Sequence, residues 1–199
     1  MSTLKFYLGQ FEDDFTLKQF RTLVMQTRPV EFICTSGVAD PANIRCQQSL
    51  KILMNSPSPP SKTTLSLGEA SHPEKILVRC LGEDRAKWQK DLTSVCGKGQ
   101  ETQVALGLTL VFLDKLLLLD STLPVSSFEY CEGIGFDKNK AMLIDAQAIE
   151  HLDILPVKQQ GPSAKQDMSL LGVLSFGVRT AFGKRMLRRW VVSPLTDKE

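Results

Sequence analysis

The stretch that comes nearest to an enzymatic motif lies close to the C-terminus. Residues 177–185 read GVRTAFGKR. A phosphate-binding loop needs its glycines at the spacing G-x-x-x-x-G-K-[ST], because the final hydroxyl holds Mg²⁺. Here five residues separate Gly177 from Gly183, and Arg185 stands in place of the hydroxyl. We therefore predict no catalytic residue, no nucleotide-binding residue and no cofactor site within this chain.

Acidic and histidine residues do not form a convincing metal site. A two-metal nuclease needs carboxylates from several elements that converge on ions about 4 Å apart. The acidic run 12–14 follows a strand-like segment, residues 4–11, that carries no carboxylate. Capping of the next helix is the better interpretation of this run. His72 lies in a loop-like segment and His151 stands among carboxylates, with no nucleophile nearby in sequence. We predict no metal site and a structural His151.

A basic face near the C-terminus could contact phosphate. At about 100° per residue, residues 181–192 form a helix with one apolar half and one basic half. The apolar half carries Phe182, Met186, Leu187, Trp190 and Val191, and the basic half carries Lys184, Arg185, Arg188 and Arg189. Such cations can bind nucleic-acid phosphates. They can equally form a solvated or salt-bridged face, and this second interpretation is the one we favour.

The residues around this helix define its ends. Thr180 is placed to cap the first turn with its side-chain oxygen. We expect Gly183 to keep that turn narrow, so that another backbone can approach. Ser193-Pro194 ends the helix, because proline has no N–H and disfavours helix at the residue before it.

The elements upstream suggest an α/β layer. Residues 4–11 read as a strand, 16–26 as a helix and 30–34 as a second strand, and this order is typical of α/β proteins. Residues 55–73 are rich in proline and serine, and we predict a mobile surface loop there. Residues 101–120 predict one long central helix. Residues 140–155 fit a strand that turns into a helix near Asp145.

Composition excludes some classes of partner. The chain has 199 residues and a net charge of +2, so no strong overall field attracts it to nucleic acid or membrane. The most apolar run, residues 104–119, is shorter than the ~20 residues that a membrane span needs, and Asp114-Lys115 interrupts it. We interpret it as a buried helix and expect no membrane partner.

Two blocks of sequence resemble the MutS family of DNA mismatch-repair proteins. The spacing T-x-F-G-K-R-x-L-R-x-W-x-x-x-P-L, from Thr180 to Leu195, is similar to the opening of the family's core (lever) domain, and residues 142–155 resemble the segment before it. Residues 6–33 resemble the connector domain. The strings G-Q-F-x-D-D (residues 9–14) and F-R-T-L-V (residues 20–24) point to a eukaryotic branch of the family. Ala148, His151 and Asp153 depart from the family's usual threonine, asparagine and glutamate.

The resemblance implies an α/β fold followed by an α fold. Residues 1–122 would form an incomplete connector domain, ribonuclease-H-like and without its first strand. Residues 123–199 would form the truncated start of a lever domain. The mismatch-binding domain would precede this stretch, and the clamp and ATPase domains would follow it. Thr180, Gly183, Trp190 and Pro194 would be core anchors. Lys184, Arg185, Arg188 and Arg189 would pair between domains or contact DNA phosphates.

The resemblance also implies what the parent protein does. It would recognise mismatched double-stranded DNA together with a second MutS homologue subunit, in the nucleus, and use ATP with Mg²⁺. This segment would carry neither activity and would transmit conformational change between the mismatch-binding and ATPase domains. The alternative is a stand-alone α/β protein-interaction module without DNA or ATP activity.

Overall fold

The computed structural model divides into two units, each with its own hydrophobic core. The residues that it describes are 4–36, 44–56, 59–66, 68, 72–83, 92, 99–134, 141–156 and 168–196. Unit 1 comprises Met1–Glu12, Glu31–Gln48 and Ser61–Phe136, and unit 2 comprises Asp13–Val30, Ser49–Pro60 and Asp137–Glu199. Helix α2 (Ile44–Met54) contributes residues to both.

The described residues of unit 1 form two small parallel sheets. Strand β1 (Lys5–Gln10) pairs with β4 (Ser127–Glu132), and β2 (Glu31–Thr35) pairs with β3 (Ser61–Leu65). The rings of Phe6 and Phe128 stack across the first pair with centroids 4.8 Å apart. A Cβ at Gly9 would collide with the carbonyl oxygen of Cys131, so β1 needs glycine there to stay in register. The predicted strands 4–11 and 30–34 are confirmed.

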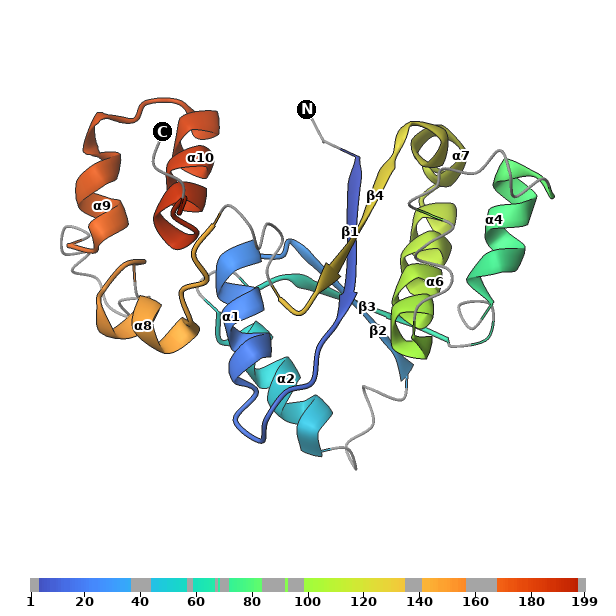
Figure 1. Ribbon diagram of the computed structural model, residues 1–199, viewed down its shortest axis with the longest axis horizontal. Helices are drawn as coiled ribbons and strands as arrows, with labels where there is room; N and C mark the ends of the chain where they lie inside the picture. The colour runs from blue at the N-terminus through green and yellow to red at the C-terminus, as the bar shows by residue number, and fades with distance from the viewer. Residues whose placement is uncertain are drawn as a thin grey trace. The chain divides into compact units, whose positions relative to one another are not determined.

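Two helices, α4 (Pro73–Leu81) and α6 (Gln100–Lys115), contribute many of the unit 1 core residues. Helix α6 contacts both β1 and α4, and Figure 1 shows it between them. Leu77, Leu106 and Leu110 are fully buried at their interface. Burial of each such side chain stabilises the unit by roughly 1.5–3 kcal/mol relative to an exposed one. The mixed α/β character predicted for this part of the chain is confirmed.

The predicted helix 101–120 is interrupted. Helix α6 ends at Lys115, and α7 (Leu119–Thr122) and the 3-10 turn η3 (Leu123–Val125) follow. Leu117 adopts a left-handed φ of 57°, its amide bonds to the carbonyl of Asp114, and the Leu118 amide bonds to that of Leu113. This pair of bonds is the Schellman stop of a helix. A leucine occupies the position that usually holds glycine, so the sequence carries no signal for the break.

No single helix among the described residues is long and apolar enough to cross a membrane. Helix α6 and the following turns, Leu119–Val125, are long and apolar enough only when taken together, and the chain bends by 111° between them. Many of the α6 side chains are buried in the unit 1 core. A helix that is buried in a protein core can have the same length and apolar composition.

The loop predicted for residues 55–73 is wrong in part. It contains β3 and the first residue of α4. The hydroxyls of Ser61 and Thr63 donate to the Glu31 carboxylate on the neighbouring strand at 2.7 and 2.6 Å, and Leu65 is buried. These contacts compensate for the polar composition that suggested a loop.

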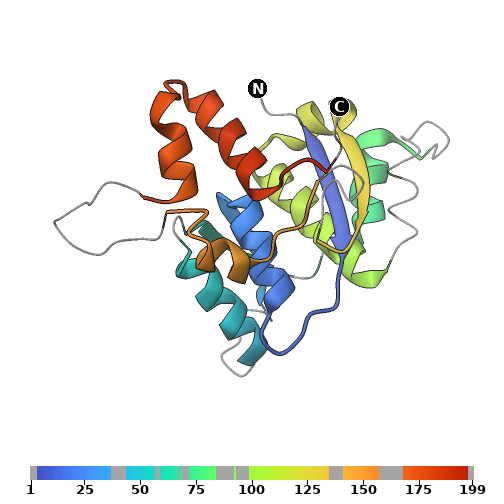
Figure 2. The same cartoon turned by 60° about the vertical axis from the view of Figure 1, so that its left-hand side comes forward.

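Unit 2 is mainly helical. It contains α1 (Lys18–Thr27), α8 (Ala146–His151), α9 (Leu170–Leu174), the turn η4 (Ser175–Gly177) and α10 (Ala181–Val192). Its core consists of Ile149, Ile154, Leu155 and Val192, with Met25, Ile144, Leu171 and Val191 against them. A bridge between Ala141 and Leu195 brings the two ends of its C-terminal part together. Figure 2 shows α9 and α10 side by side.

The units do not coincide with the boundary implied by the MutS resemblance. Helix α1 clusters with the C-terminal helices, whereas residues 123–136 cluster with unit 1, because β4 pairs with β1. The division into residues 1–122 and 123–199 stays a prediction. Residues 157–167 lie outside the described part of the chain.

Candidate functional site

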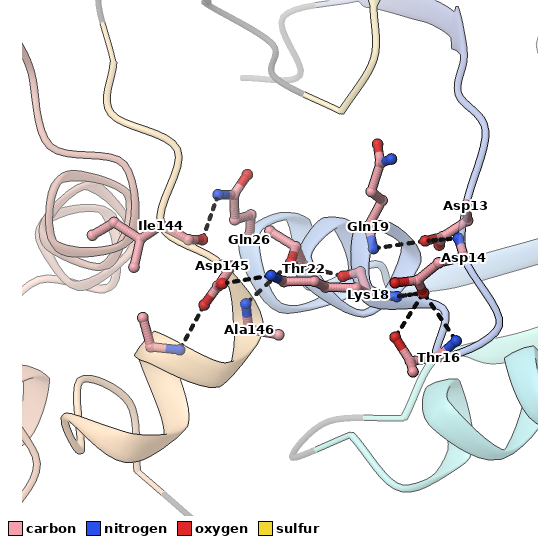
Figure 3. A network of polar contacts seen from close by, with 11 residues as sticks. Asp13, Asp14, Thr16, Lys18, Gln19, Thr22, Gln26, Ile144, Asp145 and Ala146 are labelled. Atoms are coloured by element: carbon pink, nitrogen blue, oxygen red, sulfur yellow. Dashed lines mark hydrogen bonds and ion pairs between the residues drawn. The ribbon is translucent and has the colours of Figure 1, made fainter.

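The acidic run before α1 caps that helix. The Asp13 carboxylate accepts from the amides of Gln19 and Phe20 at 3.0 and 2.7 Å. Asp14 accepts from the amide and the hydroxyl of Thr16 at 2.9 and 2.6 Å, and this hydroxyl is the main reason why the pKa of Asp14 is lowered. Two carboxylates therefore satisfy free N–H groups at the positive end of the helix (Figure 3). The capping prediction is confirmed.

One side of α1 holds the chain segment that leads into α8. Lys18, Thr22 and Gln26, which we call the polar row, lie four residues apart and so share a side of the helix. The Lys18 ammonium lies 3.4 Å from the Asp145 carboxylate. The Ala146 amide donates to the Thr22 hydroxyl at 3.0 Å, and the Gln26 side-chain amide donates to the Ile144 carbonyl at 3.2 Å (Figure 3). The polar row thus contacts residues 144, 145 and 146.

Thr22 is the buried centre of this contact. Its side chain is 1% exposed and Ala146 is 0% exposed. The hydroxyl donates to the Lys18 carbonyl at 2.9 Å while it accepts from Ala146, so it is both donor and acceptor. Because a buried N–H without a partner is costly, Thr22 fixes the position of the α8 N-terminus.

Asp145 belongs to the same contact and also begins α8. Its carboxylate accepts from the Ala148 amide at 2.7 Å, and its other oxygen faces Lys18. The Ala148 amide and then Lys18 lower the pKa of Asp145 from the ordinary value of 3.8. The predicted start of a helix near Asp145 is confirmed. The capping bond uses the backbone of Ala148, so it forms without the family's threonine side chain.

Arg188 of α10 holds the other end of α1. Its guanidinium donates to the Met25 carbonyl at 2.8 Å. The residue four positions after Met25 is Pro29, which has no N–H, so this carbonyl lacks its ordinary helical partner. A cation at a helix C-terminus is also favoured by the helix dipole. Burial, and then the positive charge of Arg28, lower the pKa of Arg188.

The predicted basic face of α10 is therefore divided by the fold. Arg188 turns inward together with Leu187, Val191 and Val192, whereas Lys184, Arg185 and Arg189 are exposed. The predicted apolar half is divided as well: Phe182 and Trp190 are 66% and 57% exposed. Whether the exposed cations contact DNA or another domain stays a prediction.

Helix α10 begins and ends where the sequence predicts. The Thr180 hydroxyl accepts from the Gly183 amide at 3.0 Å, as predicted for an N-cap, and the helix ends before Ser193-Pro194. The expected approach of another backbone to Gly183 is wrong. A Cβ there would meet the side chains of Val178 and Thr180, at 2.8 and 2.9 Å, because the chain before the helix folds over its first turn. The role of Thr180, Gly183, Trp190 and Pro194 as core anchors stays a prediction.

The remaining candidates are not brought together. His72 precedes α4 and makes no capping bond with its side chain, and His151 is exposed at the end of α8. Among the described residues, no group of His, Cys, Asp or Glu could hold a metal ion. Sequence reasoning missed the polar row. Its spacing of four was visible, but nothing local indicates which segment it contacts.

Comparison with known proteins shows a MutS-like protein, as the motifs of residues 6–33 and 142–195 predict. The relatives are mismatch-repair proteins of the MSH6 type. The chain is 28% identical to DNA mismatch repair protein MSH6 of Arabidopsis thaliana over 221 residues, which cover 100% of the chain. It is 27% and 26% identical to Msh6 of Gallus gallus and Homo sapiens, over 97% of the chain. It spans 16% of the length of each relative. No family model matches it.

Proposed function

We propose that this chain is a segment of a DNA mismatch-repair protein and that its unit 2 transmits conformational change. By its likeness to the MSH6 relatives, the parent would recognise mispaired DNA as a heterodimer with a second MutS homologue, the MutS-alpha arrangement, in the nucleus. It would use ATP and Mg²⁺ in domains that these residues do not form. Residues 1–122 would serve as the connector, with a ribonuclease-H-like fold, and 123–199 as the start of the lever.

The observation that carries this proposal is the attachment of α1 at both ends. The polar row bonds to residues 144–146, and the Met25 carbonyl accepts from Arg188. The connector-like helix is thus tied to two lever-like segments, each more than a hundred residues away in the chain. A helix held in this way cannot shift without moving its partners. Coupling between sites travels through such packed and hydrogen-bonded elements.

A chimera tests this role. The matching segment of full-length Arabidopsis thaliana MSH6 is replaced by this chain and assembled with its partner subunit. The paired change Thr22→Val and Gln26→Ala removes two contacts of the polar row. We expect unchanged affinity for mismatched DNA without ATP, and ATP-triggered release from the mismatch slowed on the order of tenfold.

Thr27→Val is the matched control. Thr27 also bonds back to a carbonyl within α1, that of Leu23 at 2.7 Å, but it is exposed and has no bond to residues 144–146. The control should behave like the unmodified chimera. Equal release by both variants would contradict a role in transmission. A chimera that binds neither DNA nor ATP would instead favour an independent protein-interaction module. The isolated 199-residue chain should show no saturable ATP binding in calorimetry at micromolar concentration.

A further inference from the structure

Left-handed backbone flanks helix α1 at both ends. Leu17, just before the helix, has φ 53° and ψ 41°, and Arg28, just after it, has φ 48° and ψ 66°. This conformation brings the Cβ of a residue too close to the following carbonyl oxygen, so it favours glycine. Glycine does occupy the positions of positive φ after α4 and β4, at Gly82 and Gly133. Neither end of α1 has glycine, and both ends are therefore strained.

Arg28 is strained for a second reason. Pro29 follows it, and a proline ring favours extended backbone at the residue before it. The Arg28 side chain is exposed, so its own burial does not offset the strain. Its positive charge also repels the Arg188 guanidinium and contributes to the lowered pKa of that group. Residue 28 therefore favours another conformation, and contacts elsewhere on α1 must hold it in this one.

The contacts that hold α1 all lie within unit 2. The Leu17 side chain is only 8% exposed, and the Arg28 amide donates to the Val24 carbonyl at 3.0 Å. Between these two ends the polar row bonds to residues 144–146, and Arg188 donates to a carbonyl near the C-terminus of the helix (Figure 3). Strained backbone persists only where the surrounding structure over-determines it. Loss of these contacts would therefore release the strain.

We propose that Leu17 and Arg28 are strained hinges that favour the release of α1 from its docked position. When the polar row and Arg188 let go, both residues return to ordinary backbone conformations and α1 leaves residues 144–146 as one piece. The strain lowers the free energy of undocking, so a ligand with a modest preference for the undocked state can release the helix. This inference rests on the proposed function for the signal that α1 transmits, but the release of strain is measurable without DNA or ATP.

Hydrogen exchange of the Ala146 amide reports how often α1 undocks, because this amide is buried and bonds to Thr22. The test compares Arg28→Gly with Arg28→Ala in the whole 199-residue chain. Both changes remove the side chain and its charge, but only glycine adopts left-handed backbone without strain. We expect the Ala146 amide to exchange about threefold to fivefold more slowly in Arg28→Gly than in Arg28→Ala.

Leu117→Gly is the matched control. Leu117 is left-handed too, with φ 57°, but it lies at the end of α6 in unit 1, and its side chain is 90% exposed. Glycine there relieves strain without the loss of a buried side chain, so the exchange of Ala146 should stay as in the wild type. A nuclear Overhauser spectrum of the wild type provides a direct readout. It should show at Arg28 the strong contact between amide and Hα protons that a positive φ produces.

Three results would overturn the proposal. Equal exchange of Ala146 in Arg28→Gly and Arg28→Ala would mean that undocking releases no strain. Slowing of the same size in Leu117→Gly would mean that Ala146 exchanges only when the whole chain unfolds. A weak contact between the amide and Hα protons of Arg28 would mean that this residue is not left-handed in solution. If the hinges pass these tests but the chimera with the altered polar row releases DNA normally, the proposed transmission alone fails.

Discussion

Thr22 and Ala146 lie 124 positions apart in the chain and are joined by a buried hydrogen bond of 3.0 Å. The Ala146 amide is one of the N–H groups in the first turn of α8 that have no partner within the helix, and the Thr22 hydroxyl accepts from it. This bond makes α1 and the start of α8 a single structural element. The polar row, Arg188 and the cap at Asp145 are arranged around it.

Thr22→Val should loosen the α8 N-terminus. Valine keeps the volume of threonine but cannot accept, so a buried N–H loses its partner at a cost of about 1–3 kcal/mol. Hydrogen exchange of the Ala146 amide should become correspondingly faster. Thr27→Val, at an exposed site on the same helix, should change the exchange of Ala146 very little. Equal protection of Ala146 in both variants would mean that the bond is not formed in solution.

Asp145 should contribute to acid sensitivity. Folding lowers the pKa of Asp145 below 3.8, through the Ala148 amide first and Lys18 second. A carboxyl with a lowered folded pKa stabilises the protein fully above its unfolded pKa, and this stabilisation is lost as the pH falls through the folded pKa. Unfolding by denaturant between about pH 6 and pH 2 should therefore show a steeper loss for the wild type than for Asp145→Asn. Parallel curves would exclude the assigned pKa shift.

Arg188 and Arg189 are neighbours that should respond differently. Arg188→Ala removes the donor to the Met25 carbonyl and should destabilise the protein by about 1.5–3 kcal/mol, the range for a bond to a charged group. Arg189→Ala removes an exposed side chain and should change stability by less than about 0.5 kcal/mol. The midpoints of urea unfolding test this difference. If the two variants unfold at the same midpoint, Arg188 does not hold the end of α1.

Trp190 should matter little to the stability of the isolated chain. Truncation of a buried aromatic side chain costs about 3–5 kcal/mol, and Trp190→Ala should cost much less because the side chain is 57% exposed. Leu110→Ala is the contrasting change, since Leu110 is 0% exposed and should cost about 2–5 kcal/mol. Thermal unfolding of the two variants provides the comparison. A large loss for Trp190→Ala would show that the Trp190 side chain is buried in solution.

Local features of the fold could be predicted from the sequence. Strand β1, helix α1 with its cap by Asp13 and Asp14, and helix α10 with its cap by Thr180 depend on residues close together in the chain. The stop of α6 at Leu117 is local too, but leucine seldom adopts the left-handed conformation, so the sequence carried no sign of it.

The sequence by itself determined many of the segments that form helices and strands, and its motifs indicated a resemblance to the MutS family. Only the tertiary structure decided which elements pair with one another and which side chains become buried. Strand β3 exists because β2 lies beside it, and α10 buries Arg188 while it exposes Trp190. The candidate site likewise depends on bonds between residues 118 to 163 positions apart. Periodicity shows that a helix has distinct sides, but the side that turns inward depends on which neighbour offers a complementary surface, and no local pattern encodes that neighbour.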